Sequence, residues 1–331
     1  MIRVAFLGTG GIAAKHSRFF KDCPDAVIVG GCDVATEKVE SLWNRTWSDG
    51  AATPDSFTDA EEMYARTSPD AAVICTPHTL HFDHCMQALA HGCHVLVEKP
   101  MVTDSKDAYR LRDKINDSGK TFVIGYNTSC SAEFAYLRRT IRDGSLGRLI
   151  QVCGYLTQGW KSDTLGSWRQ DLALSGGGQA YDSGAHILNS LCWGVDAPVA
   201  KVHAFVDNCG IDVDVNTNIN VLFENNVMAS IVVSGDCSAA GAHMSFIFTD
   251  GRIDIDGWGA TWMNVFDRKG QVKYPAVTAD MDAGQPAQNF VDAILGRAEP
   301  RATVENGVVL SELMDQIYES GRTGTVAVPK R

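Results

Sequence analysis

The first 125 residues alternate between short apolar runs and longer segments whose apolar residues recur at helical spacing. The apolar runs have strand length, and they are Ile2–Leu7, Ala26–Cys32, Ala71–Cys75 and His94–Val97. The intervening segments, such as Ile12–Cys23, have the period of amphipathic helices. Strands and helices that alternate at this length form right-handed crossovers and a parallel sheet. The pattern therefore predicts an α/β domain over residues 1–125.

The hydrophobic pattern changes after residue 125, where longer strands follow one another without intervening helices. These strands are expected at Leu149–Thr157, Val199–Asp207, Thr217–Glu224, Val227–Ser234, His243–Thr249 and Arg252–Asp256. Turns such as Glu224-Asn225-Asn226 join them, which is typical of an antiparallel sheet. We therefore predict a second α/β domain over residues 126–331 with a large, mostly antiparallel open sheet. Helices are expected at 290–295 and 304–320, and the second of these is expected to pack back toward the first domain.

The composition narrows the class of protein. The 331 residues are 45% hydrophobic and 21% charged, which is typical of globular domains. A net charge of −11 argues against a nucleic-acid partner, because nucleic-acid recognition starts from a basic surface. The chain has no apolar run of about 18 residues, and its N-terminus has no secretory pattern, so we expect no membrane span. Ten cysteines without a CxxC pair favour buried thiols and a cytoplasmic protein.

A glycine motif follows the first predicted strand directly. Gly8-Thr9-Gly10-Gly11-Ile12-Ala13 has the form G-x-G-x-x-A that binds dinucleotides. The first glycine permits a tight turn, the second lets the backbone approach a pyrophosphate, and the small Ala13 lets the helix pack closely on the strand. The amides at the start of the following helix would then face the phosphates.

An acidic residue supports this interpretation and indicates which nucleotide binds. Asp33 ends the second predicted strand, at the position where a carboxylate would accept hydrogen bonds from the adenosine ribose. A carboxylate repels a 2′-phosphate, and Val34 offers no cation to bind one. We therefore predict NAD rather than NADP as the cofactor, although Lys38 is near enough in sequence to reach a phosphate.

The predicted strand Val95–Val97 ends in Glu98-Lys99-Pro100. Alternate side chains of a strand point to opposite faces, so Glu98 and Lys99 should diverge. Pro100 has no amide hydrogen and forces the backbone to turn. Because open α/β sheets bind ligands at the carboxyl ends of their strands, Lys99 is a candidate catalytic residue.

Three histidines spaced three residues apart raise the alternative of a metal site. His78, His81 and His84 could share one face of a helix, with Cys85 nearby. A zinc site usually has paired cysteines or a His-Glu-x-x-His pattern, and neither occurs here. We therefore predict no bound metal, and expect some of these rings to line the cofactor cleft.

A second group of candidate residues lies in the predicted C-terminal domain. Gly176-Gly177-Gly178 can bring the backbone close to a ligand, and Asp182 and His186 are four residues apart. A helix starting near Gly178 would place both on one face. Histidine has an ordinary pKa of about 6.5 and is the usual general base at neutral pH. Upstream, Trp168 and Arg169 are candidates for the wall of a sugar pocket, although Trp168 is equally suited to a core.

In combination these motifs resemble the glucose-fructose oxidoreductase, inositol dehydrogenase and rhizopine-catabolism (Gfo/Idh/MocA) oxidoreductases. The resemblance covers nearly the whole chain. The motifs that carry it occur in the family's order: the glycine motif, Thr76-Pro77 with His81, Glu98-Lys99-Pro100, Gly125-Tyr126-Asn127, and Gly176 through Asp182 to His186.

The resemblance implies a Rossmann domain, a second α/β domain whose sheet joins subunits into a homodimer or homotetramer, and specific site residues. Lys99 would lie beside the nicotinamide, often next to a cis proline bond, and Asp182 and His186 would be the substrate-binding acid and the catalytic histidine. Cofactor contacts are expected from Gly8, Thr9, Gly10, Gly11, Ile12, Asp33, Thr76, Pro77, His81, Glu98 and Lys99. Substrate contacts are expected from Lys99, Tyr126, Asn127, Trp168, Arg169, Asp182 and His186.

The sequence departs from the family's pattern at two places. Asn189 stands where the family often has an acid, and Ser129-Cys130 replaces a frequent Arg-Phe pair. Neither change removes an expected catalytic group. The first alters the local charge near the helix, and the second is expected to reshape the pocket.

The expected activity is hydride transfer between NAD and a hydroxyl-bearing carbon of a sugar, cyclitol or derivative. His186 would take the hydroxyl proton, while Lys99 would hydrogen-bond the same oxygen. Two alternatives stay open. One is a glycosidase or lyase that oxidises the sugar transiently and eliminates a group, and the other is a nucleotide-sensing regulator without catalysis.

Overall fold

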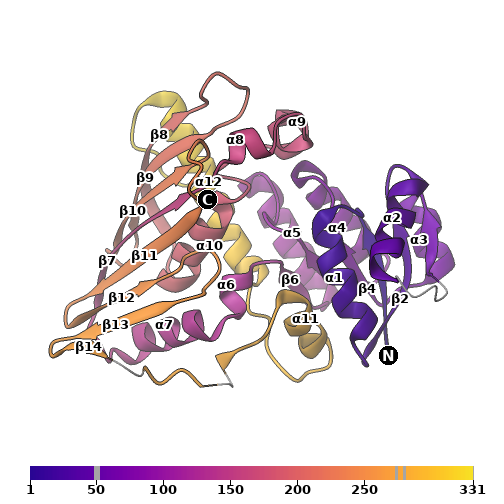
Figure 1. Ribbon diagram of the computed structural model, residues 1–331, viewed down its shortest axis with the longest axis horizontal. Helices are drawn as coiled ribbons and strands as arrows, with labels where there is room; N and C mark the ends of the chain where they lie inside the picture. Colours follow the sequence, from indigo (N-terminus) through magenta and orange to yellow (C-terminus); the bar gives the residue numbers. More distant parts are fainter. Residues whose placement is uncertain (48–52, 273–274, 279–280, 331) are drawn as a thin grey trace. The chain divides into compact units, whose positions relative to one another are not determined.

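The computed structural model describes residues 1–47, 53–272, 275–278 and 281–330, which form two compact units (Figure 1). The first unit contains Met1–Val102, Lys106–Gly125 and Gln285–Val304. The second contains Thr103–Ser105, Tyr126–Gly284 and Glu305–Arg331. This division differs from a single cut near residue 125 in two short segments, residues 103–105 and residues 285–304.

Unit 1 is built on a parallel six-stranded sheet with the strand order β3-β2-β1-β4-β5-β6. Its strands are β1 (Ile2–Leu7), β2 (Ala26–Cys32), β3 (Asp55–Phe57), β4 (Ala71–Ile74), β5 (His94–Val97) and β6 (Phe122–Ile124). Each adjacent pair is parallel, which confirms the predicted Rossmann sheet. The sequence pattern did not indicate β3, because three residues are too short for a recognisable alternation.

Helices cover the sheet of unit 1, as the alternation of strands and helices in the sequence predicts. They are α1 (Gly11–Asp22), α2 (Thr36–Thr46), α3 (Ala60–Thr67), the 3₁₀ turn η1 (His78–Leu80), α4 (His81–Ala90), α5 (Ser105–Ser118) and α11 (Pro286–Ile294). Helix α11 joins this unit because Ala287, Phe290 and Val291 are buried in the same apolar cluster as Val4 and Phe6 of β1. Burial of a side chain such as Phe290 contributes about 2–3 kcal/mol. Helix α11 thus belongs to the first unit, whereas the helix over 304–320 belongs to the second.

Unit 2 contains an eight-stranded sheet with the order β14-β13-β12-β11-β7-β10-β9-β8. Its strands are β7 (Leu149–Thr157), β8 (Val199–Asp207), β9 (Asn216–Phe223), β10 (Met228–Ser234), β11 (Gly241–Phe248), β12 (Gly251–Ile255), β13 (Met263–Asp267) and β14 (Gly270–Val272). Strands β7 and β10 pair in parallel and all other neighbours are antiparallel, which confirms the predicted mostly antiparallel sheet. Strands β13 and β14 had no counterpart in the sequence analysis.

The helices of unit 2 bury one face of this sheet and leave the other open. They are α6 (Asn127–Cys130), α7 (Ala132–Asp143), α8 (Trp160–Asp163), the 3₁₀ turn η2 (Trp168–Gln170), α9 (Leu172–Ser175), α10 (Gly184–Val195) and α12 (Val304–Thr323). Helix α10 packs on β7, and α7 packs on α10, so both lie on the same side of the sheet (Figure 1). The open face presents Tyr155, Phe205, Met228 and Val232, which are each more than 40% exposed.

None of the helices in the described part of the chain combines the length and the apolar content that a membrane crossing requires.

Candidate functional site

The three glycines of the motif have different surroundings. Close packing requires a glycine at one position, and the other two positions border open space. Gly8 has φ +83°, and a Cβ placed there would lie 2.6 Å from the carbonyl carbon of Cys75. Gly8 therefore lets the turn pack against the end of β4. Around Gly10 and Gly11, apart from the adjacent residues and the backbone of α1 itself, no atom of the described residues lies within 4 Å of an added Cβ. This open space lies where α1 begins, so the free amides of its first turn fit a diphosphate group.

Asp33, at the end of β2, holds the glycine turn. Its Oδ2 accepts hydrogen bonds from the backbone amide of Thr9 at 2.8 Å and from the Thr9 hydroxyl at 2.9 Å. Two cations lie close to this contact: Lys38 Nζ is 3.5 Å from Oδ1 of Asp33, and Arg45 donates to the carbonyl oxygen of Thr9 at 3.1 Å. The acid predicted to bind the ribose thus also supports the turn, and it has cationic neighbours.

Lys99 follows β5 directly and is half-buried, while the Glu98 side chain turns into the protein and is 8% exposed as a residue. Glu98 Oε2 accepts a hydrogen bond from the Lys99 amide at 3.2 Å, and Oε1 lies 2.8 Å from Nε2 of His16 in α1. The Lys99–Pro100 peptide bond is cis. The strand end therefore directs Glu98 inward and Lys99 outward, as the alternation of strand side chains predicts.

His81 is fully buried, and both of its ring nitrogens face backbone carbonyls. Nδ1 lies 2.7 Å from the oxygen of Pro100, and Nε2 lies 2.9 Å from the oxygen of Thr76. Burial lowers the pKa of His81, whereas the two carbonyl contacts act to raise it. A neutral imidazole carries one N–H, so the ring donates a hydrogen bond to one of these two oxygens and lies against the other. A contact of His81 with the cofactor stays a prediction.

The neighbouring histidines have separate environments. His84 Nδ1 lies 2.9 Å from the hydroxyl of Thr76, and His78 contacts the ring of His81 edge-on. Within the described ranges, His, Cys, Asp and Glu side chains form no group of three that could hold a metal ion.

In unit 2 the structure brings Asp182, Arg169 and Trp168 together. Asp182 is 5% exposed, and its Oδ2 accepts hydrogen bonds from Arg169 Nε at 2.9 Å and from Trp160 Nε1 at 2.8 Å. The Arg169 guanidinium lies 4.6 Å from the ring centre of Trp168. The carboxylate is thus fixed by two donors and neutralised by one cation. Trp160, which the sequence analysis did not single out, is fully buried.

His186 occupies a distinctive position in α10, because every other residue of this helix is buried. Its ring contacts the edge of Tyr126 and lies 6.3 Å from the ring of Trp258. The Nδ1 atom is enclosed by protein. Tyr126 is fully buried, whereas Asn127 at the start of α6 is exposed. Since α10 begins at Gly184, Asp182 lies in the preceding turns and not in the helix that was expected to start near Gly178.

Asp214, which the sequence analysis did not single out, explains why α10 begins at Gly184 and not near Gly178. It is 3% exposed and accepts hydrogen bonds from the amides of Gly178 and Ala180 at 2.7 and 2.8 Å, and from the hydroxyl of Tyr318. Burial raises the pKa of Tyr318, and the adjacent carboxylate adds to this shift. Because the Asp214 carboxylate accepts hydrogen bonds from the amides of Gly178 and Ala180, this segment forms turns, and α10 begins only at Gly184. The sequence carries no signal that separates buried Asp214 from exposed Asp212.

The two departures from the family's pattern contact each other. Asn189 Nδ2 donates a hydrogen bond to Ser129 Oγ at 3.1 Å, and both residues are 1% exposed. Next to them, the Ser190 hydroxyl donates to Thr128 Oγ1 at 2.9 Å. A neutral polar network therefore joins α6 to α10, and it includes the two positions where the family often has charged residues.

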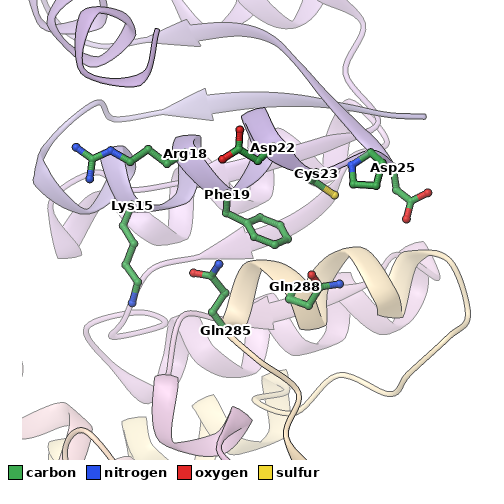
Figure 2. Close-up of a pocket in the computed structure, with 9 residues that line it drawn as sticks. Lys15, Arg18, Phe19, Asp22, Cys23, Asp25, Gln285 and Gln288 are labelled. Atoms are coloured by element: carbon green, nitrogen blue, oxygen red, sulfur yellow. The ribbon is translucent and has the colours of Figure 1, made fainter. Parts of the chain in front are cut away.

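An open groove of about 570 Å³ lies elsewhere in unit 1, between α1 and the start of α11 (Figure 2). It is lined by Lys15, Arg18, Phe19, Asp22, Cys23, Pro24, Asp25, Gln285 and Gln288. Two cations and two anions balance each other there, and none of the predicted site residues lines it. We therefore do not assign the candidate site to this groove.

Comparisons with known proteins identify the class that this fold and these residues define. Residues 2–126 match the model of an oxidoreductase family with an NAD-binding Rossmann fold (GFO_IDH_MocA), and residues 134–254 match the GFO/IDH/MocA C-terminal domain. The chain belongs to the GFO/IDH/MocA oxidoreductase family, which confirms the resemblance seen in the sequence.

Relatives that align over most of the chain are sugar dehydrogenases. D-glucoside 3-dehydrogenase of Escherichia coli K12 is 23% identical over 98% of this chain and 96% of its own length. The NADP-dependent D-xylose 1-dehydrogenase of Haloarcula marismortui is 26% identical over 97% of this chain and 91% of its own length. The structure of WlbA dehydrogenase from Bordetella pertussis, in complex with NADH and UDP-GlcNAcA, shares the fold. It has a TM-score of 0.84 and 22% identity, and the match covers 100% of this chain and 98% of that one.

Proposed function

We propose that this protein transfers a hydride between NAD and a hydroxyl-bearing carbon of a sugar, cyclitol or sugar derivative. The observation that carries the proposal is the half-buried Lys99 at the carboxyl end of β5, in the unit that also bears the glycine turn. Ligands of open α/β sheets bind at this edge. The dehydrogenase activities of the relatives support the same chemistry.

The cofactor would be held by unit 1. The amides of Gly10, Gly11 and Ile12 would bind the diphosphate in the open space at the start of α1, and Asp33 would bind the ribose hydroxyls. Thr76, Pro77 and Glu98 stay predicted contacts nearer the nicotinamide. When bound, NAD supplies the hydride acceptor or, reduced, the donor.

Lys99 and His186 have distinct proposed roles at the substrate hydroxyl. Lys99 Nζ donates a hydrogen bond to the oxygen, which stabilises the negative charge that develops as the proton leaves. His186 takes that proton, and because Nδ1 is enclosed, Nε2 is the nitrogen for the transfer. Asp182 accepts hydrogen bonds from substrate hydroxyls, and Trp160 and Arg169 hold its carboxylate in place.

Four further residues are proposed to shape the sugar pocket. The face of Trp168 suits the C–H side of a sugar ring, Arg169 and Asn127 offer donors, and Tyr126 fixes the ring of His186 by edge contact.

NAD is the proposed cofactor in preference to NADP. If Asp33 binds the adenosine ribose as proposed, its carboxylate repels a 2′-phosphate, although Lys38 lies 3.5 Å from it. The alternatives, transient oxidation with elimination and nucleotide sensing without catalysis, have less support, because the two relatives that align over most of the chain carry the names of dehydrogenases.

The test measures NADH absorbance with NAD, and then with NADP, against methyl α-D-glucopyranoside, D-xylose, myo-inositol and related sugar acids. We expect turnover with NAD, and a fall in kcat of about 10²–10⁴-fold in both Lys99→Ala and His186→Ala. Lys269→Ala, a matched change of an exposed lysine in the β13–β14 hairpin, should retain full activity.

Three outcomes would contradict this proposal. Normal kcat in Lys99→Ala would remove its catalytic role. Release of an aglycone without net NADH would favour elimination, and nucleotide binding without turnover of any panel member would favour a sensor.

We also propose that the protein is a cytoplasmic homo-oligomer, which assembles through the open face of the eight-stranded sheet of unit 2. All ten cysteines are free thiols, as is usual in a reducing compartment. The exposed Tyr155, Phe205, Met228 and Val232 would be covered by a second copy of the chain. Light scattering that gives the mass of one chain would exclude this assembly.

A further inference from the structure

Two buried histidines, from two different helices of unit 1, contact the Glu98-Lys99-Pro100 turn. His16 lies in α1, the helix that follows the glycine turn, and is 2% exposed. His81 is the first residue of α4 and is completely buried. Removing a histidine ring from water costs free energy unless its nitrogens find hydrogen-bond partners. The partners of His16 and His81 therefore indicate which parts of the chain the two rings hold in place.

The contact of His16 reaches Lys99 through Glu98. The Glu98 carboxylate binds His16 Nε2 through Oε1 at 2.8 Å and the Lys99 amide through Oε2 at 3.2 Å. A Cβ on Gly125 would lie 2.8 Å from Oε1, so only glycine leaves room for the carboxylate beside β6. The amide of Lys99 is therefore fixed by a carboxylate whose own position depends on His16.

The contact of His81 is on the other side of Lys99 along the chain. Its Nδ1 lies 2.7 Å from the Pro100 oxygen and its Nε2 lies 2.9 Å from the Thr76 oxygen. A neutral ring donates a hydrogen bond to one of these oxygens, and because it is fully buried between them it packs against both the residue after Lys99 and the loop after β4. That loop also packs on Gly8, whose added Cβ would meet Cys75 and Thr76.

We propose that His16 and His81 are positioning residues, which fix the backbone on both sides of Lys99 and so set where its Nζ lies. This inference rests on the proposed role of Lys99. Lysine has a long flexible side chain, and a displacement of about 1 Å at a reacting group can cost about 10²-fold in rate. Because the two rings attach the turn to α1 and to the Thr76 loop, the position of Lys99 is linked to the predicted nucleotide contacts.

The kinetic test uses His16→Gln, His81→Gln and the two alanine variants, with NAD and the panel sugar that gives turnover. We expect kcat to fall about 10–100-fold while KM for NAD changes less than about 3-fold. In a Lys99→Ala background the same changes should have no further effect, because the group that they position is gone. His91→Gln is the matched control, since His91 caps the far end of α4 and pairs with exposed Glu61.

A full additional loss of kcat in the Lys99→Ala background would overturn the inference, because the histidines would then act on the fold in general. Full activity of Lys99→Ala would instead overturn the proposed function, so the two failures are distinguishable.

Amide hydrogen exchange provides a readout without a substrate. In the glutamine variants, exchange of the peptide containing Lys99 and Met101 should accelerate about 10-fold or more, whereas the peptide from β1 should keep its protection. Unchanged exchange at Lys99 in every folded variant would refute the positioning role of His16 and His81, whether or not a sugar is turned over.

Discussion

The Lys99 turn of unit 1 and the Gly176–Asp182 loop of unit 2 are both held by buried polar side chains, but in different ways. Lys99 is held by Glu98, which follows the same strand β5, and by His81, which begins the helix after the neighbouring strand β4. The glycine loop is held by Asp214, which comes from a distant part of the chain and is itself bound by Tyr318 of α12.

This difference follows from the two sheets. In a parallel sheet the carboxyl ends of all strands meet at one edge, so groups that end successive strands are brought together by topology alone. A mostly antiparallel sheet has no such common edge, and its loop needs a specific anchor. The comparison predicts that unit 2 depends more strongly on a single side chain.

Replacement of that anchor should have the largest effect. Asp214→Ala removes the acceptor of two backbone amides and one tyrosine hydroxyl, and each buried group left without a partner costs about 1–3 kcal/mol. We expect a loss of about 3 kcal/mol or more in the free energy of unfolding, measured by urea denaturation. Asp212→Ala, two residues away and exposed, should change it by less than about 0.5 kcal/mol. Equal stability of the two variants would mean that Asp214 is not the anchor.

The glycine turn offers a sharper comparison within unit 1. Gly8→Ala should destabilise the protein by about 1–3 kcal/mol, because φ is +83° and the new Cβ would collide with the Cys75–Thr76 peptide. At Gly10 the backbone has φ −68° and a Cβ would enter open space. The melting temperature of Gly10→Ala should therefore stay near that of the unmodified protein. Its affinity for NAD should instead fall about 10-fold, as measured by protein fluorescence quenching, because the methyl group occupies the diphosphate space. Unchanged affinity would place the nucleotide elsewhere.

The smallest effects are expected at the acid beside the glycine turn. Asp33→Ala should lower kcat/KM for NAD about 10-fold and raise the ratio of NADP to NAD activity, since the carboxylate that repels a 2′-phosphate is removed. Lys38→Ala should lower only the NADP activity, by about 3-fold, because its ammonium is largely exposed and screened. Lys114→Ala in α5 is the control. A preference for NADP in the unmodified protein would reverse the assignment of Asp33.

The sequence by itself determined the parallel sheet, the class of cofactor fold and the candidates Lys99, Asp182 and His186. Its signals were local: period, glycine spacing and the residues that end each strand. The tertiary structure alone decided that α11 returns to the first unit, that Asp214 anchors the glycine loop, and that His16 and His81 hold the Lys99 turn. These contacts join residues far apart in the chain, and no local pattern specifies which buried polar group meets which partner. For the same reason the pairing of Asn189 with Ser129 appeared in the sequence as two unrelated departures.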